Sequence, residues 1–326
     1  MCTSIFMRTE DNKHILARTM DFSYPLDAKP IYIPREHNWV SGADNKQWNN
    51  ELGFLGTGSS LGKDYFVCDG VNEAGISIAE LYLPGEALYQ KEAESGSLNF
   101  CPHEFIMWVL GNISSIEELG ETLDSINLVE RPVPMLGFVT PLHWIITDKS
   151  GKSVVIEPTE KKLRFKEDPV EVMTNTPQLE WHLENLRNYL NVRPEQFDPI
   201  NYGGYEATAF SQGTGTSGLP GGYTPPERFV RATFFKQFIE KAADENEGVM
   251  NALHILATVS IPKGVVVKST GEQDYSQFIS MMCNESRTVY FNDYATNGIT
   301  RVTMTEELLE QREVKIFEID KTPVYK

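Results

Sequence analysis

Strand-hairpin patterns alternate with helical patterns along the chain, and this alternation limits the fold more than any other feature. The segment HWIITDKSGKSVVIEP has two runs of alternating apolar residues around the turn DKSG, which is the pattern of an antiparallel hairpin. The same reasoning predicts hairpins within 4–20, 65–85 and 277–304, and helices within 102–127, 178–190 and 227–259. Hairpins with helices inserted between them indicate an α+β fold of two antiparallel sheets with helices outside.

We expect a single domain over residues 1–326, because no repeat, coiled coil or low-complexity tract divides the chain. Residues 199–226 are rich in Gly, Thr, Ser and Pro, and they predict a long loop. A loop of that length is usually functional or holds an assembly contact.

The charge of the chain excludes some classes of partner. It has 46 acidic and 29 basic side chains, for a net charge of −17. Such a surface repels phosphates, so nucleic acid and anionic membranes are not expected partners. Charged residues interrupt the first apolar stretch, so neither a signal peptide nor a membrane span is predicted.

The four cysteines are far apart in the sequence and show no zinc-type spacing. We therefore expect free thiols, a cytoplasmic location, and no metal or organic cofactor.

Cys2 lies almost at the end of the chain, where it would become the first residue if Met1 were removed. A thiol and a free α-amine would then share one residue. Because an α-amine has a pKa near about 7.7–8, it can accept the thiol proton and later return it to a leaving amine. The alternatives are a lipid anchor, which the missing apolar signal disfavours, and a small residue without a role.

Arg18 and Asp21 accompany Cys2 in the first predicted hairpin, in the segment LARTMDF. A turn near Asp11–Asn12 would bring both beside residue 2. The guanidinium would favour the thiolate, and the carboxylate would hold the ammonium form of the terminus. The alternative is an ordinary charge pair on a surface hairpin.

Several segments, in order along the chain, resemble the choloylglycine hydrolase family. They are MCTSI, LARTMDF, VNEAGISIAELYLPG, PLHWIITDKSGKSVVIEP, VMTNTP, GLPGGYTPPERFVR and SIPKGVV. This family comprises N-terminal-nucleophile amidases and includes penicillin V acylases and conjugated bile salt hydrolases. The resemblance spans nearly the whole chain and implies the αββα sandwich of that class.

The resemblance also implies roles for individual residues. Cys2 matches the nucleophile, and Arg18 and Asp21 match the thiol-tuning arginine and the amine-holding aspartate. Asn175, in MTNTP, matches the oxyanion-hole asparagine, and Arg228, in ERFVR, matches a second active-site arginine. Without the resemblance, Asn175 would be a turn residue and Arg228 a charge on a helix face.

Tyr82, in ELYLPG, bears on the substrate. Typical bile salt hydrolases have asparagine here, and tyrosine resembles the penicillin V acylase branch. The sequence therefore predicts hydrolysis of phenoxymethylpenicillin. Conjugated bile salts and N-acyl homoserine lactones are alternative substrates, and a non-catalytic binding protein with a blocked N-terminus is an alternative of another class.

The acyl pocket is expected to involve three segments, 22–27, 58–65 and 133–138, whose apolar residues suit such a site. The candidate substrate-binding residues are Phe22, Leu61, Tyr65, Met135 and Phe138. Residues 190–222 match the region through which family members assemble, which implies a homotetramer.

Overall fold

Two antiparallel sheets form the centre of the computed structural model, which describes residues 1–61 and 64–322. The first sheet has the order β14–β1–β2–β18–β19–β20, and β17 also pairs with β18. Its strands are β1 (Cys2–Arg8), β2 (His14–Phe22), β14 (Val172–Met173), β17 (Val266–Val267), β18 (Gln273–Cys283), β19 (Thr288–Asp293) and β20 (Ile299–Thr303).

The second sheet has the order β13–β12–β11–β8–β7–β6–β3–β21. Its strands are β3 (Lys29–Ile33), β6 (Phe54–Leu61), β7 (Asp64–Asn72), β8 (Ser77–Tyr82), β11 (Leu142–Thr147), β12 (Ser153–Ile156), β13 (Phe165–Glu167) and β21 (Lys315–Ile316). Two-stranded pairs lie outside it: β4 (Asn38–Val40) with β5 (Gln47–Asn49), and β9 (Leu98–Phe100) with β10 (Ile126–Leu128).

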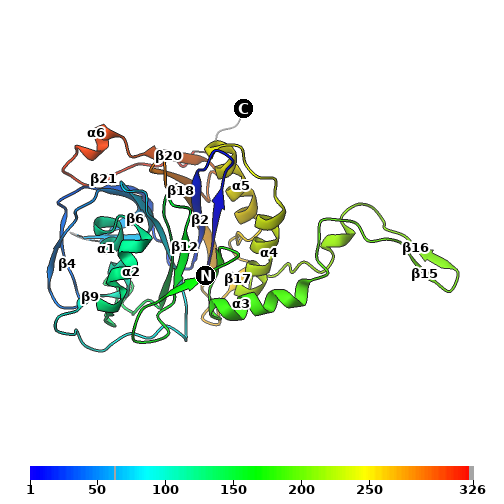
Figure 1. The fold of residues 1–326 in the computed structure, drawn as a ribbon, viewed down its shortest axis with the longest axis horizontal. Coiled ribbons are helices and arrows are strands. Elements are labelled where there is room, and N and C mark those ends of the chain that lie inside the picture. Colours follow the sequence, from blue (N-terminus) through cyan, green and yellow to red (C-terminus); the bar gives the residue numbers. More distant parts are fainter. Residues whose placement is uncertain (62–63, 323–326) are drawn as a thin grey trace.

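Helices cover the outer face of each sheet, as Figure 1 shows. Helices α1 (Phe105–Asn112) and α2 (Ile116–Thr122) lie on the second sheet, and α4 (Pro225–Phe238) and α5 (Glu245–Ala257) lie on the first. One apolar core fills the space between the sheets and under α4 and α5, and another lies under α1 and α2. This arrangement confirms the predicted αββα sandwich.

The remaining helices are short. They are α3 (Leu179–Asn185) and α6 (Glu306–Leu309), with 3-10 turns η1 (Pro102–Glu104), η2 (Leu123–Ser125), η3 (Leu186–Tyr189) and η4 (Thr214–Thr216).

The register of the first hairpin positions the predicted active-site residues. Ser4 lies opposite Arg18 and Cys2 lies opposite Met20, so these four side chains share one face of the sheet. That face is turned toward the second sheet, where Arg18 contacts Asp69. The alternate residues, Asp21 among them, lie on the opposite face, toward α4.

The region expected to be only a loop contains a further hairpin, β15 (Ile200–Tyr202) and β16 (Tyr205–Ala207). Gly203 and Gly204 form its turn with φ values of 59° and 99°, which side-chain-bearing residues rarely adopt. The sequence YGGY between two short β-prone runs is the signal that would have predicted it. This hairpin projects away from the sandwich as an arm (Figure 1).

No helix in the described part of the chain is both long and apolar enough to cross a membrane.

Candidate active site

The thiol of Cys2 lies at the start of β1, buried between the two sheets. Arg18 Nη2 donates a hydrogen bond to Cys2 Sγ at 2.9 Å and a second to the main-chain carbonyl of Glu80 at 3.2 Å. The Arg18 side chain is completely buried. A buried guanidinium beside a sulfur atom favours the ionised form of that sulfur, which is the form that acts as a nucleophile.

Asp69, on β7 of the second sheet, holds this arginine in place. Its Oδ2 lies 3.3 Å from Arg18 Nη1, and its Oδ1 accepts a hydrogen bond of 2.8 Å from Ser280 on β18. Burial alone would lower the pKa of Arg18, but the surrounding acidic groups, Cys2 and Asp69 among them, outweigh burial and raise it. Arg18 is therefore a permanent cation. Sequence reasoning missed Asp69, because its partners are 51 and 211 residues away.

Arg228 connects helix α4 to the start of β1. Its Nη1 donates to the main-chain carbonyl of Cys2 and to Thr3 Oγ1, the latter at 2.6 Å, and its Nη2 donates to Asn175 Oδ1 at 2.7 Å. This arginine therefore fixes both the backbone of Cys2 and the side chain of Asn175.

Asn175 lies directly beside the backbone of Cys2. Its Oδ1 accepts a hydrogen bond from the Cys2 backbone nitrogen at 2.9 Å, and its Nδ2 donates to the carbonyl of Tyr82 at 2.7 Å. The amide orientation is consistent, since Oδ1 receives two donors and Nδ2 has an acceptor. An Nδ2 group in this position can donate to an oxyanion formed above the thiol.

Two histidines that belong to no recognisable sequence motif contact the backbone of the segment that contains Asn175. His182 Nε2 lies 2.8 Å from the carbonyl oxygen of Asn175, and its ring stacks on Phe229. His143 Nε2 lies 3.1 Å from the carbonyl of Thr174. Both rings are buried, and they contact the backbone carbonyls of two consecutive residues of this segment.

Tyr82 contributes main-chain groups and a ring. The Leu83 nitrogen donates to the Pro141 carbonyl at 2.7 Å. Because hydrogen-bonded and non-hydrogen-bonded pairs alternate along an antiparallel ladder, the next pair, Tyr82 and Leu142, is a non-hydrogen-bonded pair. The main-chain groups of Tyr82 therefore point away from β11, and its carbonyl meets Asn175. The ring packs edge-on against Phe22, with centroids 5.4 Å apart.

Asp21 directly follows Met20, the residue paired with Cys2. Its carboxylate accepts hydrogen bonds from Thr19 Oγ1 at 3.0 Å and from Ser276 Oγ, and Arg228 Nη1 lies 3.8 Å away. The ammonium of Met1 contacts the main-chain carbonyl of Asp21 rather than the carboxylate. The role of Asp21 toward a freed amine on Cys2 stays a prediction.

Two cavities meet at the N-terminus, and Met1, Phe22 and Tyr82 line both. The smaller, of about 20 Å³, lies against the thiol, and its other walls are mostly apolar: Leu26, Phe66, Leu136 and Leu142. The larger, of about 300 Å³, adds polar groups: Asn175, Lys268 and Asp274. Two compartments thus lie against the same residues beside Cys2, and only the larger one includes Asn175, Lys268 and Asp274.

Glu80 also lines the apolar cavity, although it is 3% exposed. Burial raises the pKa of Glu80 well above its usual range, with Arg18 opposing part of that effect. Burial therefore disfavours an anion at Glu80, beside the thiol.

The expected acyl-pocket residues fall in different places. Phe22 lines both cavities, whereas Met135 and Phe138 line neither, and Phe138 is 45% exposed. Leu136, between them, faces the apolar cavity instead. The side chain of Leu61 lies outside the described part of the structure.

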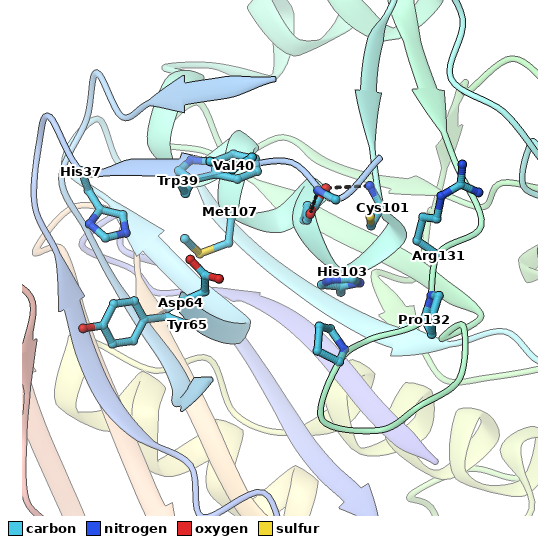
Figure 2. Close-up of a pocket in the computed structure, with 13 residues that line it drawn as sticks. His37, Trp39, Val40, Asp64, Tyr65, Cys101, His103, Met107, Arg131 and Pro132 are labelled. Atoms are coloured by element: carbon cyan, nitrogen blue, oxygen red, sulfur yellow. Dashed lines mark hydrogen bonds between the residues drawn. The ribbon is translucent and has the colours of Figure 1, made fainter. Parts of the chain in front are cut away.

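Tyr65 lines a separate cavity of about 240 Å³, shown in Figure 2 with His37, Asp64 and Met107. Neighbouring Phe66 faces the Cys2 cavity, as the alternation of side chains along a strand requires. Within residues 1–61 and 64–322, the one group of side chains with the composition of a metal site also lies at this separate cavity.

Comparisons with known proteins agree with this geometry. Residues 2–317 match the family described as linear amide C–N hydrolases, choloylglycine hydrolase family. The chain is 35% identical to a bile salt hydrolase/transferase from Clostridium perfringens over 99% of this chain and 98% of that protein.

Solved structures show the same likeness. Variants C2A and R18L of the conjugated bile acid hydrolase from Clostridium perfringens superpose with TM-scores of 0.92 and 0.91 at 34% identity, over 100% of this chain and 99% of theirs. A penicillin V acylase from Agrobacterium tumefaciens shares the fold, with a TM-score of 0.76 at 22% identity over 96% of this chain and 90% of its own. The chain therefore belongs to the choloylglycine hydrolase family and is a hydrolase of linear amide C–N bonds.

Proposed function

We propose that this enzyme hydrolyses the amide bond of conjugated bile acids, with Cys2 as its nucleophile once Met1 has been removed. The contact between Arg18 and Cys2 Sγ at 2.9 Å, beside Asn175 and Arg228, carries the proposal. The names of the similar proteins support the substrate class, since the bile salt hydrolase from Clostridium perfringens is 34–35% identical and the penicillin V acylase only 22%.

The reaction proceeds in two steps. The α-amine of Cys2 takes the thiol proton, and the sulfur attacks the amide carbon to give a tetrahedral oxyanion. Collapse breaks the C–N bond, the protonated α-amine gives its proton to the leaving nitrogen, and a thioester remains. A water molecule, deprotonated by the same amine, then releases the carboxylic acid and restores the thiol.

Three residues stabilise the negative charges that develop on the oxyanion and on the sulfur. Asn175 Nδ2 and the N–H of Tyr82 donate to the oxyanion, while Arg18 stabilises the sulfur as a thiolate leaving group. One N–H of Asn175 Nδ2 donates to the Tyr82 carbonyl, and its second N–H can donate to the oxyanion. Arg228 is a positioning residue, because its contacts fix Asn175 and the Cys2 backbone.

The walls of the two cavities suit the two halves of such a substrate, and the cavity of about 20 Å³ at the thiol must widen to hold a steroid. A steroid acyl group is large and apolar, like the wall formed by Leu26, Phe66 and Leu136. The leaving amino acid is anionic, and Lys268 is the cation that lines the larger cavity, with its Nζ 3.5 Å from Asp274 Oδ1. Loss of Met1 from the lining of both cavities enlarges the space next to the thiol.

Penicillin V is the second candidate substrate. The edge-on pair of Phe22 and Tyr82 favours it, because an aromatic wall suits a phenoxyacetyl group. It is the substrate that the tyrosine in ELYLPG predicts, but the comparisons support the bile acid amide better.

A panel of substrates tests the proposal on protein whose mass verifies loss of Met1. We expect kcat/KM for glycocholate to exceed that for penicillin V and for N-acyl homoserine lactones by about tenfold or more, which is about 1.4 kcal/mol of transition-state discrimination. Cys2→Ala should abolish all three activities. A higher kcat/KM for penicillin V would overturn the substrate class, and turnover by Cys2→Ala or by Met1-retaining protein would overturn the nucleophile.

We also propose that the chain is one domain and assembles as a cytoplasmic homotetramer through residues 190–222. The arm supports this assembly because apolar side chains on it lack cover, with Phe210 fully and Tyr205 largely exposed. All four cysteines are free thiols, which agrees with a reducing compartment.

A further inference from the structure

The cavity shown in Figure 2 has a group of ligand-type side chains at one end, away from His37 and Tyr65. Cys101, His103 and Glu104 belong to the short segment where β9 passes into η1. Each offers one ligand atom, and these three atoms lie within 4.8 Å of one another. In tetrahedral zinc sites, bonds of about 2.0–2.3 Å place ligand atoms about 3.3–3.8 Å apart, so small side-chain rotations would complete the geometry.

The carboxylate of Glu104 is oriented and retains a free acceptor position. Gly42 N donates to Oε1 at 2.7 Å, and Cys101 N and Ser41 Oγ both donate to Oε2 at 2.8 Å. A carboxylate has about four lone-pair positions, so Oε1 can still bind a cation.

Gly42 leaves room beside the thiol and this oxygen. A Cβ atom on Gly42 would lie 3.2 Å from Cys101 Sγ and 3.4 Å from Glu104 Oε1. The sulfur and the free oxygen position therefore face the same small residue, which itself lines the cavity.

His103 supplies an independent sign of a missing ligand. Its Nδ1 atom is buried and has no hydrogen-bond partner among the described residues. A ring nitrogen of a neutral imidazole has a lone pair that it can donate to a metal ion. Buried polar atoms without partners are rare in native proteins, and an unseen ion or water is one explanation.

We propose that Cys101, His103 and Glu104 bind a zinc ion, with a water molecule from the cavity as the fourth ligand. One thiolate, one carboxylate and a neutral imidazole offset the two charges of Zn²⁺, so the bound site carries no net charge. This matters because burying net charge is costly. Such a site adds a metal that the spacing of the cysteines in the sequence does not predict.

The free form of the site differs from the zinc form by a proton. In the absence of metal, an ordinary cysteine thiol carries its proton near pH 7. The zinc ion takes the place of that proton on the sulfur, and the proton is released to solvent.

Arg131, a cation that lines the same cavity, is engaged elsewhere. Its guanidinium donates to the carbonyls of Lys91 and Glu130 at 2.8 and 3.1 Å and lies 3.5 Å from Glu92. The zinc site is independent of the amidase reaction, since its three ligands lie outside the lining of the two cavities at Cys2.

Metal titration of the full chain tests the site. Cys2→Ser serves as the background, because the reactive thiol is itself a metal ligand. After treatment with a chelator, we expect about one Zn²⁺ per chain by calorimetry, release of about one proton, and a thiolate-to-cobalt charge-transfer band when Co²⁺ is used instead.

Variants of the ligands provide the control. Cys101→Ser should remove the cobalt band, and His103→Gln should weaken zinc binding at least about tenfold. Cys68→Ser, at another buried thiol, should leave both unchanged. His103→Gln keeps the Cys101–Glu104 contacts, so it remains informative if Cys101→Ser fails to fold. Binding only at millimolar zinc, or a band that survives Cys101→Ser, would overturn the proposal.

Discussion

Asp69 Oδ2 lies 3.3 Å from Arg18 Nη1, and both side chains are completely buried between the sheets. The other terminal nitrogen of the same guanidinium contacts Cys2 Sγ at 2.9 Å. The second sheet therefore orients the group that acts on the thiol of the first sheet.

Asp69→Asn should slow the enzyme through Arg18. Removing the carboxylate leaves the buried guanidinium without its ion-pair partner. Such a change typically lowers the free energy of unfolding by about 3–5 kcal/mol. We expect alkylation of Cys2 by iodoacetamide to slow by about tenfold or more at pH 7, measured by mass spectrometry. Asp64→Asn, an exposed carboxylate on the same strand, is the matched control. An alkylation rate in Asp69→Asn equal to that of the unaltered enzyme would contradict the positioning role.

Asn175→Ala should lower kcat by about 10²–10³-fold, or about 2.7–4 kcal/mol, because it removes an oxyanion donor. Asn175→Asp keeps the shape and the Oδ1 contacts but replaces Nδ2 with an acceptor. We expect it to lose as much activity while KM changes little, in steady-state assays on the preferred amide. If Asn175→Asp kept its activity, Asn175 would have a structural role only and would not donate to the oxyanion.

Tyr82→Phe should retain kcat. The hydroxyl of Tyr82 is buried with no hydrogen-bond partner among the described residues, and burial raises its pKa so that it stays neutral. Tyr82→Ala removes the ring that packs on Phe22 and should raise KM for phenoxyacetyl amides more than for bile acid amides. A large loss of kcat in Tyr82→Phe would instead give the hydroxyl a chemical role.

His182 should make the fold sensitive to acid. Burial lowers the pKa of His182 below its usual value of 6.5, although the contact with the Asn175 carbonyl opposes this effect. The unfolded chain therefore binds a proton more readily than the folded one, so the free energy of unfolding falls as the pH drops below about 6.5. His182→Gln should flatten this dependence in urea titrations over a pH series from neutral to mildly acidic. The same slope in both proteins would show that other groups cause it.

The arm should affect assembly without affecting chemistry. Replacing Tyr205, on β16, and Phe210, shortly after it, by Ser removes exposed apolar surface, and β16 lies far from the N-terminus in Figure 1. We expect a smaller species in sedimentation analysis and unchanged kcat per chain. A tetramer that persists in the double variant would place the contact elsewhere.

Much of the fold follows from local patterns. The alternation of apolar residues predicts the first hairpin and the strand that ends at Cys283, and the structure has both. The helices and the turn at DKSG likewise follow from spacing and turn residues. Alternation also separates Tyr65 from Phe66, so the expectation that Tyr65 lines the acyl pocket could have been corrected from the strand pattern alone.

The parts of the site that sequence reasoning missed depend on distant contacts. Asp69 meets Ser280, and His182 meets the carbonyl of Asn175, through packing that no local pattern encodes. Leu136 belongs to a loop whose path is set by the strands around it. Local periodicity carries no information about which strands become neighbours, so these residues emerge only in three dimensions.

The order of strands in the first sheet has a consequence for biosynthesis. The ribosome makes β1 and β2 first, but their outer neighbours β14 and β18 begin at Val172 and Gln273, and Arg228 lies between those two positions in the chain. Most of the polypeptide must therefore be translated before the thiol acquires its full set of neighbours. A nascent chain carries Cys2 as an ordinary cysteine, and the residue gains its reactive surroundings only when translation is nearly complete.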